Sequence, residues 1–124
     1  VLYHAGVAFG ANFLMTVVLQ SLDLLRDAGM EQPERLMAPL LSASLDNALR
    51  HGDTALTGPV ARGDARTVAD HLLHIDAVSP AAAAAYRALA RLTADRALSA
   101  GLIDVAAAAE LLAALSSPSS GESS

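Results

Sequence analysis

Two polar side chains in the first apolar stretch of the sequence could take part in proton transfer. His4 and Asn12 are eight residues apart, which on an α-helix places them on one side and about 12 Å apart along the axis. An imidazole exchanges protons near neutral pH, and a carboxamide can orient a bound group by hydrogen bonding. The same spacing suits two hydrogen-bonded polar groups in a helical core, and spacing alone does not decide between the two interpretations.

A second group of candidate residues occupies the glycine- and proline-rich segment 52–64. Thr57, Arg62 and Asp64 lie there, directly before a helix that is predicted to begin at Ala65 with Asp64 as its N-cap. Free backbone N–H groups at a helix start, together with an arginine, can hold an anion such as a carboxylate. A capped loop with solvated charges would have the same composition.

The composition excludes several kinds of site and partner. Cysteine is absent, which excludes disulfides, thiolate metal ligands and a thiol nucleophile. His71 and His74 are three residues apart, but no third ligand accompanies them, and we predict no metal site. The net charge of −5 and the lack of any basic cluster argue against nucleic acid as a partner.

The elements that must position the candidate residues are predicted to be helices. Hydrophobic residues make up 53% of the 124 residues and aromatic residues only 3%, and the abundant alanine and leucine favour helix over strand. Capping residues, glycines and prolines delimit helices over residues 2–28, 33–51, 65–75, 80–100 and 104–115. We therefore predict an all-α fold, a bundle of about five helices over residues 1–115, followed by a flexible serine-rich tail, residues 116–124.

The sequence predicts one further feature in each of two of these helices. Pro39 lies inside the second helix and is expected to kink or restart it. The apolar stripe expected on helix 80–100 includes Ala85, Leu89, Leu92 and Ala97.

The first helix is expected to be buried. Residues 1–22 contain no charged side chain, and about 20 apolar residues can span a bilayer. Polar residues interrupt the run, however, and no positively charged flank accompanies it, so we predict a central helix covered by protein and no membrane partner. Gly6 and Gly10 lie opposite the side of His4 and Asn12, where the lack of side chains would let another backbone come close.

Two motifs together resemble the DUF 2520 family of Rossmann-like proteins. Residues 3–12, Tyr-His-Ala-Gly-Val-Ala-Phe-Gly-Ala-Asn, resemble the opening of that family's C-terminal domain. Residues 56–64, Leu-Thr-Gly-Pro-Val-Ala-Arg-Gly-Asp, followed by Thr67-Val68 and His71-Leu72, resemble its second signature. The resemblance covers residues 1–97. It implies a helical domain like the C-terminal domains of 6-phosphogluconate dehydrogenase and ketopantoate reductase, with an N-terminal Rossmann domain that is absent from this chain.

The resemblance also implies roles for particular residues. In the related oxidoreductases, a lysine on the first long helix of this domain assists the substrate carbonyl, and an asparagine one or two turns later binds the substrate. His4 stands at the place of the lysine and Asn12 at the place of the asparagine two turns on, whereas Ala8 occupies the one-turn position. We therefore expect His4 and Asn12 to be catalytic. The expected substrate-binding residues are Thr57, Arg62 and Asp64.

The expected function is that of a substrate-binding and dimerisation domain in a cytoplasmic NAD(P)-dependent reductase of a small 2-oxo acid, with ketopantoate as the best single candidate. The chain contains no Gly-x-Gly-x-x-Gly sequence, so NADP or NAD is expected to bind the absent domain, and this chain alone is expected to be inactive. A mean hydropathy of +0.40 favours a homodimer that covers apolar surface. The alternative is a non-catalytic helical module that dimerises or binds a small ligand.

Overall fold

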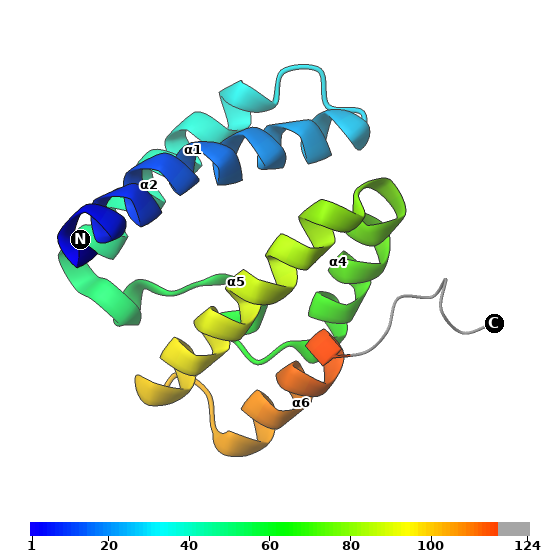
Figure 1. Cartoon of the computed structure of the whole chain (residues 1–124). Coiled ribbons are helices and arrows are strands. Elements are labelled where there is room, and N and C mark those ends of the chain that lie inside the picture. The colour runs from blue at the N-terminus through cyan, green and yellow to red at the C-terminus, as the bar shows by residue number, and fades with distance from the viewer. Residues whose placement is uncertain (117–124) are drawn as a thin grey trace. The chain divides into compact units, whose positions relative to one another are not determined.

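The computed structural model describes residues 1–116, and within that range every regular element is helical. The elements are α1 (Leu2–Asp27), α2 (Pro33–His51), a 3-10 turn (Gly52–Ala55), α3 (Gly58–Ala61), α4 (Ala65–Val78), α5 (Pro80–Ser99) and α6 (Val105–Ser116) (Figure 1). No strand occurs among these residues, and five of the helices have 12 residues or more. The all-α prediction is therefore confirmed. Of the predicted tail, Ser116 ends α6, and the other residues lie outside the described range.

Side-chain caps begin the later helices where the sequence indicated. The hydroxyl oxygen of Ser79 accepts a hydrogen bond from the backbone N–H of Ala82 at 3.1 Å, at the start of α5. Asp104 accepts one from Ala107 at 2.8 Å, at the start of α6. Each bond satisfies a backbone donor that a helix end leaves without an intrahelical partner. α2 contains Pro39 in its interior and does not restart there.

The chain divides into two compact units, the first covering Val1–Ser42 and the second Ala43–Ser124. In the first unit, α1 ends before Gly29, whose φ of +98° is readily adopted only by glycine. Arg26, in the last turn of α1, donates a hydrogen bond of 2.5 Å to Glu34 at the start of α2. The turn and this ion pair connect the two helices of the unit.

α1 is exposed, contrary to the expectation that protein covers it. None of its residues is buried, and Phe9 and Phe13 are 60% and 57% exposed while their rings contact each other edge to face. A Cβ atom added to Gly6 or Gly10 would meet nothing within 4 Å, so the expected close backbone approach is not made within the first unit. The apolar composition predicted that other parts of the protein cover this helix. In its own unit the only other helix is part of α2, and no residue of α1 is buried.

α1 is also long and apolar enough to cross a membrane. The most apolar window of the helix has a mean hydropathy of 1.5, and its residues are not buried. This property concerns length and composition alone, and buried helices of soluble proteins and signal sequences share it.

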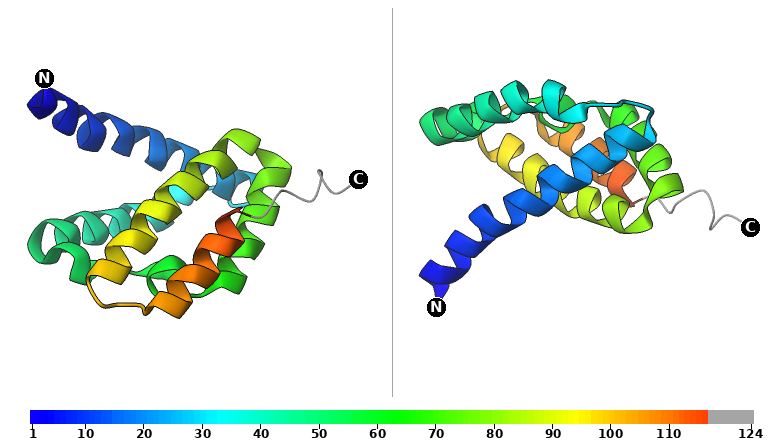
Figure 2. Two further views of the ribbon diagram at one scale, coloured as in Figure 1. Left: turned by 60° about the horizontal axis from the view of Figure 1, so that its bottom comes forward. Right: turned by 90° about the horizontal axis from the view of Figure 1, so that it is seen from above.

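The second unit is a bundle in which α4, α5 and α6 contact one another, and α3 packs against α4 and α5 (Figure 2). Val68 and Leu72 of α4 and Leu111 and Leu115 of α6 are four of the bulky side chains in its hydrophobic core. All four are almost completely buried. Because burying such a side chain contributes about 1.5–3 kcal/mol, these residues are the main source of the unit's stability.

α5 contributes alanines to the core instead of leucines. Its buried residues are Ala83, Ala90, Ala94 and Ala97. The expected stripe is thus right at Ala97 and wrong at Ala85, Leu89 and Leu92, which are exposed. The physical reason is close packing, since methyl side chains allow α4 and α6 to approach the backbone of α5. The larger leucines then point away from the bundle.

Two contacts anchor the segment between α2 and α4. The guanidinium of Arg96 on α5 donates to the carboxylate of Asp53 in the 3-10 turn at 3.0 Å. Gly63, with a φ of +72°, lies so close to α6 that an added Cβ would be 3.0 Å from the Cβ of Ala107. Glycine is therefore required at this position both by its backbone conformation and by the space available.

Candidate ligand-binding site

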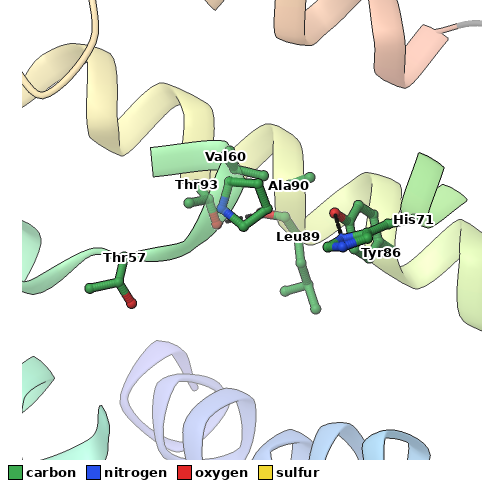
Figure 3. Close-up of a pocket in the computed structure, with 8 residues that line it drawn as sticks. Thr57, Val60, His71, Tyr86, Leu89, Ala90 and Thr93 are labelled. Carbon is green, nitrogen blue, oxygen red and sulfur yellow. Dashed lines mark hydrogen bonds between the residues drawn. The ribbon is translucent and has the colours of Figure 1, made fainter. Parts of the chain in front are cut away.

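A cavity of about 330 Å³ opens in the second unit beside α3, α4 and α5 (Figure 3). The residues that line it are Thr57, Pro59, Val60, His71, Tyr86, Leu89, Ala90 and Thr93. Most of the wall is aliphatic, and polar atoms are few. This composition is typical of sites that bind small molecules, in which apolar surface provides affinity and a few polar groups orient the ligand.

His71 and Tyr86 form a hydrogen-bonded pair at the cavity. The Nδ1 atom of His71 on α4 lies 3.0 Å from the hydroxyl oxygen of Tyr86 on α5, and the rings meet edge to face. Burial raises the pKa of Tyr86 above its usual 10.0, so the phenol keeps its proton at neutral pH. When the imidazole is neutral, its tautomer decides the direction of the bond. Either the Tyr86 hydroxyl donates to Nδ1 and the ring proton of His71 is on Nε2, or Nδ1–H donates to the phenolic oxygen.

Two threonines add hydroxyl groups to the lining. The Thr93 hydroxyl donates to the backbone carbonyl of Leu89 at 2.8 Å, so its proton is used within α5. Thr57 is the residue before α3, and its side chain makes no capping hydrogen bond to that helix. Figure 3 shows Thr57 and the His71–Tyr86 pair at opposite ends of the residues drawn. The cavity therefore has polar groups at both ends, and the Thr93 hydroxyl lies between them.

Asp64 fixes the start of the helix that carries His71. Its Oδ1 accepts a hydrogen bond from the backbone N–H of Thr67 at 3.1 Å, and its Oδ2 accepts one from the Thr67 hydroxyl at 2.7 Å. These hydrogen bonds lower the pKa of Asp64 below its usual 3.8, and the charges of Arg62 and His71 act in the same direction. Asp64 is therefore a carboxylate at neutral pH, and both of its oxygens take part in the cap.

The predicted site residues belong to different units. His4 and Asn12 are on α1 in the first unit, and both are exposed, so the interpretation that they are buried core groups does not hold within this chain. Thr57, Arg62 and Asp64 are in the second unit. Of these three, Thr57 lines the cavity, Arg62 is exposed at the end of α3, and Asp64 caps α4.

Sequence reasoning missed the pairing of His71 with Tyr86. In the sequence, His71 stands out as a possible metal ligand and as a member of the second motif. Within residues 1–116 no group of three or more His, Cys, Asp or Glu residues could hold a metal ion. A usable signal was its place in the second motif, one helical turn after Thr67. Tyr86 lies on the next helix, and which of its faces meets α4 depends on the hairpin register, which the sequence spacing does not define.

The fold and the cavity define an all-helical domain with an open, mostly apolar cavity in its second unit. The sequence matches the family model described as Domain of unknown function (DUF2520) over residues 1–93 of 124, and the chain therefore belongs to this family. No curated protein and no solved structure matches the chain. Membership confirms the predicted DUF 2520 relationship, and the name of the family assigns no activity.

Proposed function

We propose that this chain is the substrate-binding and dimerisation domain of an NAD(P)-dependent reductase of a small 2-oxo acid, with ketopantoate as the best single candidate. Two findings support the proposal: membership of the DUF2520 family and the exposure of His4 and Asn12 on α1. The exposure carries most weight. Groups that meet a substrate have to be accessible, and a histidine and an asparagine committed to a hydrophobic core would not be.

The nucleotide is proposed to bind elsewhere in the same protein. Residues 1–116 contain no strand, and so they do not provide the strand, glycine turn and helix that hold a pyrophosphate in Rossmann domains. When bound there, a nicotinamide nucleotide supplies the hydride.

The proposed roles of the residues follow from their chemistry. His4, as an imidazolium, donates a proton to the oxygen of the substrate carbonyl as negative charge develops on it, and Asn12 orients the substrate by a hydrogen bond. Arg62 and Thr57 bind the substrate carboxylate, Arg62 through its charge and Thr57 through its hydroxyl. Asp64 keeps the start of α4 in place through its two hydrogen bonds from Thr67.

The dimerisation role is supported by the apolar surface of α1. Ten of the large hydrophobic side chains in residues 1–19 are exposed, among them Phe9, Phe13 and Met15. So many exposed large hydrophobic side chains on one helix favour an interaction site, and a second copy of the chain would cover them by symmetry. We expect a dimer in sedimentation velocity. A monomer at high concentration would contradict this role, and solubility only in detergent would indicate a membrane as the cover.

The reductase proposal is tested with the full-length protein that contains this chain. NADPH oxidation is followed with ketopantoate and related 2-oxo acids, and His4→Ala is compared with the unchanged protein. Because general acid catalysis contributes about 10²–10⁴-fold, kcat should fall by a factor in that range. His51→Ala is the matched control, since His51 is an exposed histidine outside the candidate site. Undiminished turnover in His4→Ala would remove His4 from the mechanism.

The second candidate function is a non-catalytic module that dimerises or binds a regulatory ligand. The exposed apolar surface of α1 favours it, because dimerisation alone would explain that surface. NADPH binding without turnover of any 2-oxo acid, together with a tight dimer, would favour this function over the reductase.

A further inference from the structure

We propose that the cavity beside α3, α4 and α5 binds a small aliphatic molecule that carries a carbonyl or carboxylate group, and that the His71–Tyr86 pair is its hydrogen-bonding contact. Neither residue has a role in the proposed reductase mechanism. The site follows from the cavity and its lining, and only the choice of a 2-oxo acid as probe below rests on the proposed function.

The walls of the cavity indicate the body of the ligand. Pro59, Val60, Leu89 and Ala90 present aliphatic surface, so the complementary group is a compact hydrocarbon chain. Leu89 remains 42% exposed on a helix whose core contacts are made by alanines, and it has apolar surface left for a ligand to cover. A volume of about 330 Å³ is at the lower end of the range for ligand sites, which indicates a small molecule.

The His71–Tyr86 pair indicates the polar group of the ligand. With a neutral imidazole, either the Tyr86 hydroxyl donates to Nδ1 and Nε2–H remains as a donor, or Nδ1–H donates to the phenolic oxygen and the Tyr86 hydroxyl proton remains. With a protonated imidazole, Nδ1–H donates to the phenolic oxygen, and both Nε2–H and the Tyr86 hydroxyl proton remain. In each of these states the pair offers at least one donor, and the proposed ligand brings an acceptor to it. A carbonyl or carboxylate oxygen meets this requirement, and an ammonium group does not.

The neighbouring charged group does not compete for this donor. The carboxylate of Asp64 interacts electrostatically with His71, but both of its oxygens already accept hydrogen bonds from Thr67. At the other end of the cavity, the hydroxyl of Thr57 is not used to cap α3 and can serve as a second donor to an acidic group.

Binding is tested on the purified protein without nucleotide, by calorimetric titration with 3-methyl-2-oxobutanoate, which has a branched aliphatic body and two acceptor groups. Saturable binding is expected, and 3-methylbutylammonium, which has a similar body and no acceptor, should not bind. His71→Gln and Tyr86→Phe should each weaken binding about three- to tenfold, the effect of removing one hydrogen bond. The matched controls are His74→Gln and Tyr3→Phe, whose residues do not line the cavity.

A further pair of variants tests the cavity without altering the hydrogen bond. Leu89→Asp places a negative charge at the cavity wall and should abolish binding of the anion, whereas Leu92→Asp, at an exposed position of the same helix outside the lining, should leave it unchanged. Both positions are exposed, so neither variant disturbs the core.

The outcomes separate this site from the proposed reductase. Absence of saturable binding, equal binding of the ammonium probe, or unaltered binding in His71→Gln, Tyr86→Phe and Leu89→Asp would overturn the site. The reductase is judged by a different measurement, NADPH oxidation and its dependence on His4, although Thr57 belongs to both proposals. Conversely, binding that depends on His71 in a protein that never oxidises NADPH would support the site while contradicting the reductase.

Discussion

The Nδ1 atom of His71 lies 3.0 Å from the hydroxyl oxygen of Tyr86, and the planes of the two rings are 89° apart. The residues are fifteen positions apart and come from α4 and α5, which are joined only through Ser79. A hydrogen bond combined with an edge-to-face contact holds both rings in one orientation at the cavity wall. The position of this pair at the cavity therefore depends on how α4 and α5 pack against each other.

The ionisation of Tyr86 provides a direct measurement of its environment. In the variant Tyr3→Phe, Tyr86 is the only tyrosine of the chain, and we expect its phenolate absorbance to develop with a midpoint above pH 10.0, because burial disfavours the charged form. Since the pKa is higher in the folded than in the unfolded protein, the free energy of unfolding should decrease as the pH rises past 10.0. A midpoint at or below 10.0 would show that Tyr86 is solvated.

Asp64 should make stability depend on pH in the acidic range. Its pKa is lower in the folded protein than the usual 3.8, so its contribution is complete at neutral pH and is lost as the pH falls below about 3.8. Urea unfolding of the unchanged protein and of Asp64→Asn should therefore differ at pH 7 and converge as the pH approaches the folded-state pKa. A difference that does not depend on pH would mean that the carboxylate charge is irrelevant to the cap.

Gly63 and Gly58 allow backbone strain to be separated from lack of space. Both have positive φ, but an added Cβ meets Ala107 at 3.0 Å in the first case and nothing within 4 Å in the second. Gly58→Ala should cost about 1 kcal/mol of unfolding free energy from strain, and Gly63→Ala clearly more. Adding Ala107→Gly to Gly63→Ala should restore part of the loss. If the two single variants unfold alike, α6 does not constrain Gly63.

The core of the second unit can be tested with adjacent leucines on α6. Leu111 is completely buried, whereas Leu112 is 41% exposed. Leu111→Ala should lower the free energy of unfolding by about 2–5 kcal/mol, because it removes buried apolar surface and leaves a cavity. Leu112→Ala should cost less than about 1 kcal/mol. Comparable losses in chemical denaturation would contradict the observed orientation of α6.

Substitutions of the glycines of α1 can test whether a second copy of the chain packs against this helix. Within the chain, an added methyl group at Gly6 or Gly10 meets open space, so replacement by alanine should raise helix stability by about 0.5–1 kcal/mol each. If a second copy approaches closely at these positions, the same methyl groups should weaken the dimer. We expect both effects, which circular dichroism and sedimentation equilibrium measure separately. A dimer of unchanged affinity would exclude Gly6 and Gly10 from the interface.

The ends of the helices could be predicted because they depend on local chemistry. Gly29, Ser79 and Asp104 act at the predicted positions, through a backbone conformation in the first case and through hydrogen bonds in the other two. One exception is the end of α4, which was predicted near Ile75 and lies at Val78. Another is the segment 52–64, for which no helix was predicted and which contains the 3-10 turn and α3. Ser79 directly follows α4 and caps α5, so no separate linker is needed between the helices.

The features that could not be predicted all depend on partners distant in the sequence. The apolar composition of α1 indicated that another surface covers this helix, but it did not indicate which surface. Leu89 and Leu92 were expected inside because large apolar side chains usually are, yet close helix packing selected the alanines of α5. The pairing of His71 with Tyr86 likewise follows from that packing, since it requires the register of α4 against α5.

The alanine face of α5 has a consequence for the conformational entropy of folding. An alanine side chain has no rotamers, so Ala83, Ala90, Ala94 and Ala97 become buried without losing side-chain freedom, whereas each leucine in their place would lose about 0.5–1 kcal/mol of it. The shape of this face is therefore already determined in the isolated helix. The contact has little room for adjustment, and Ala90, which also lines the cavity, belongs to this preorganised face.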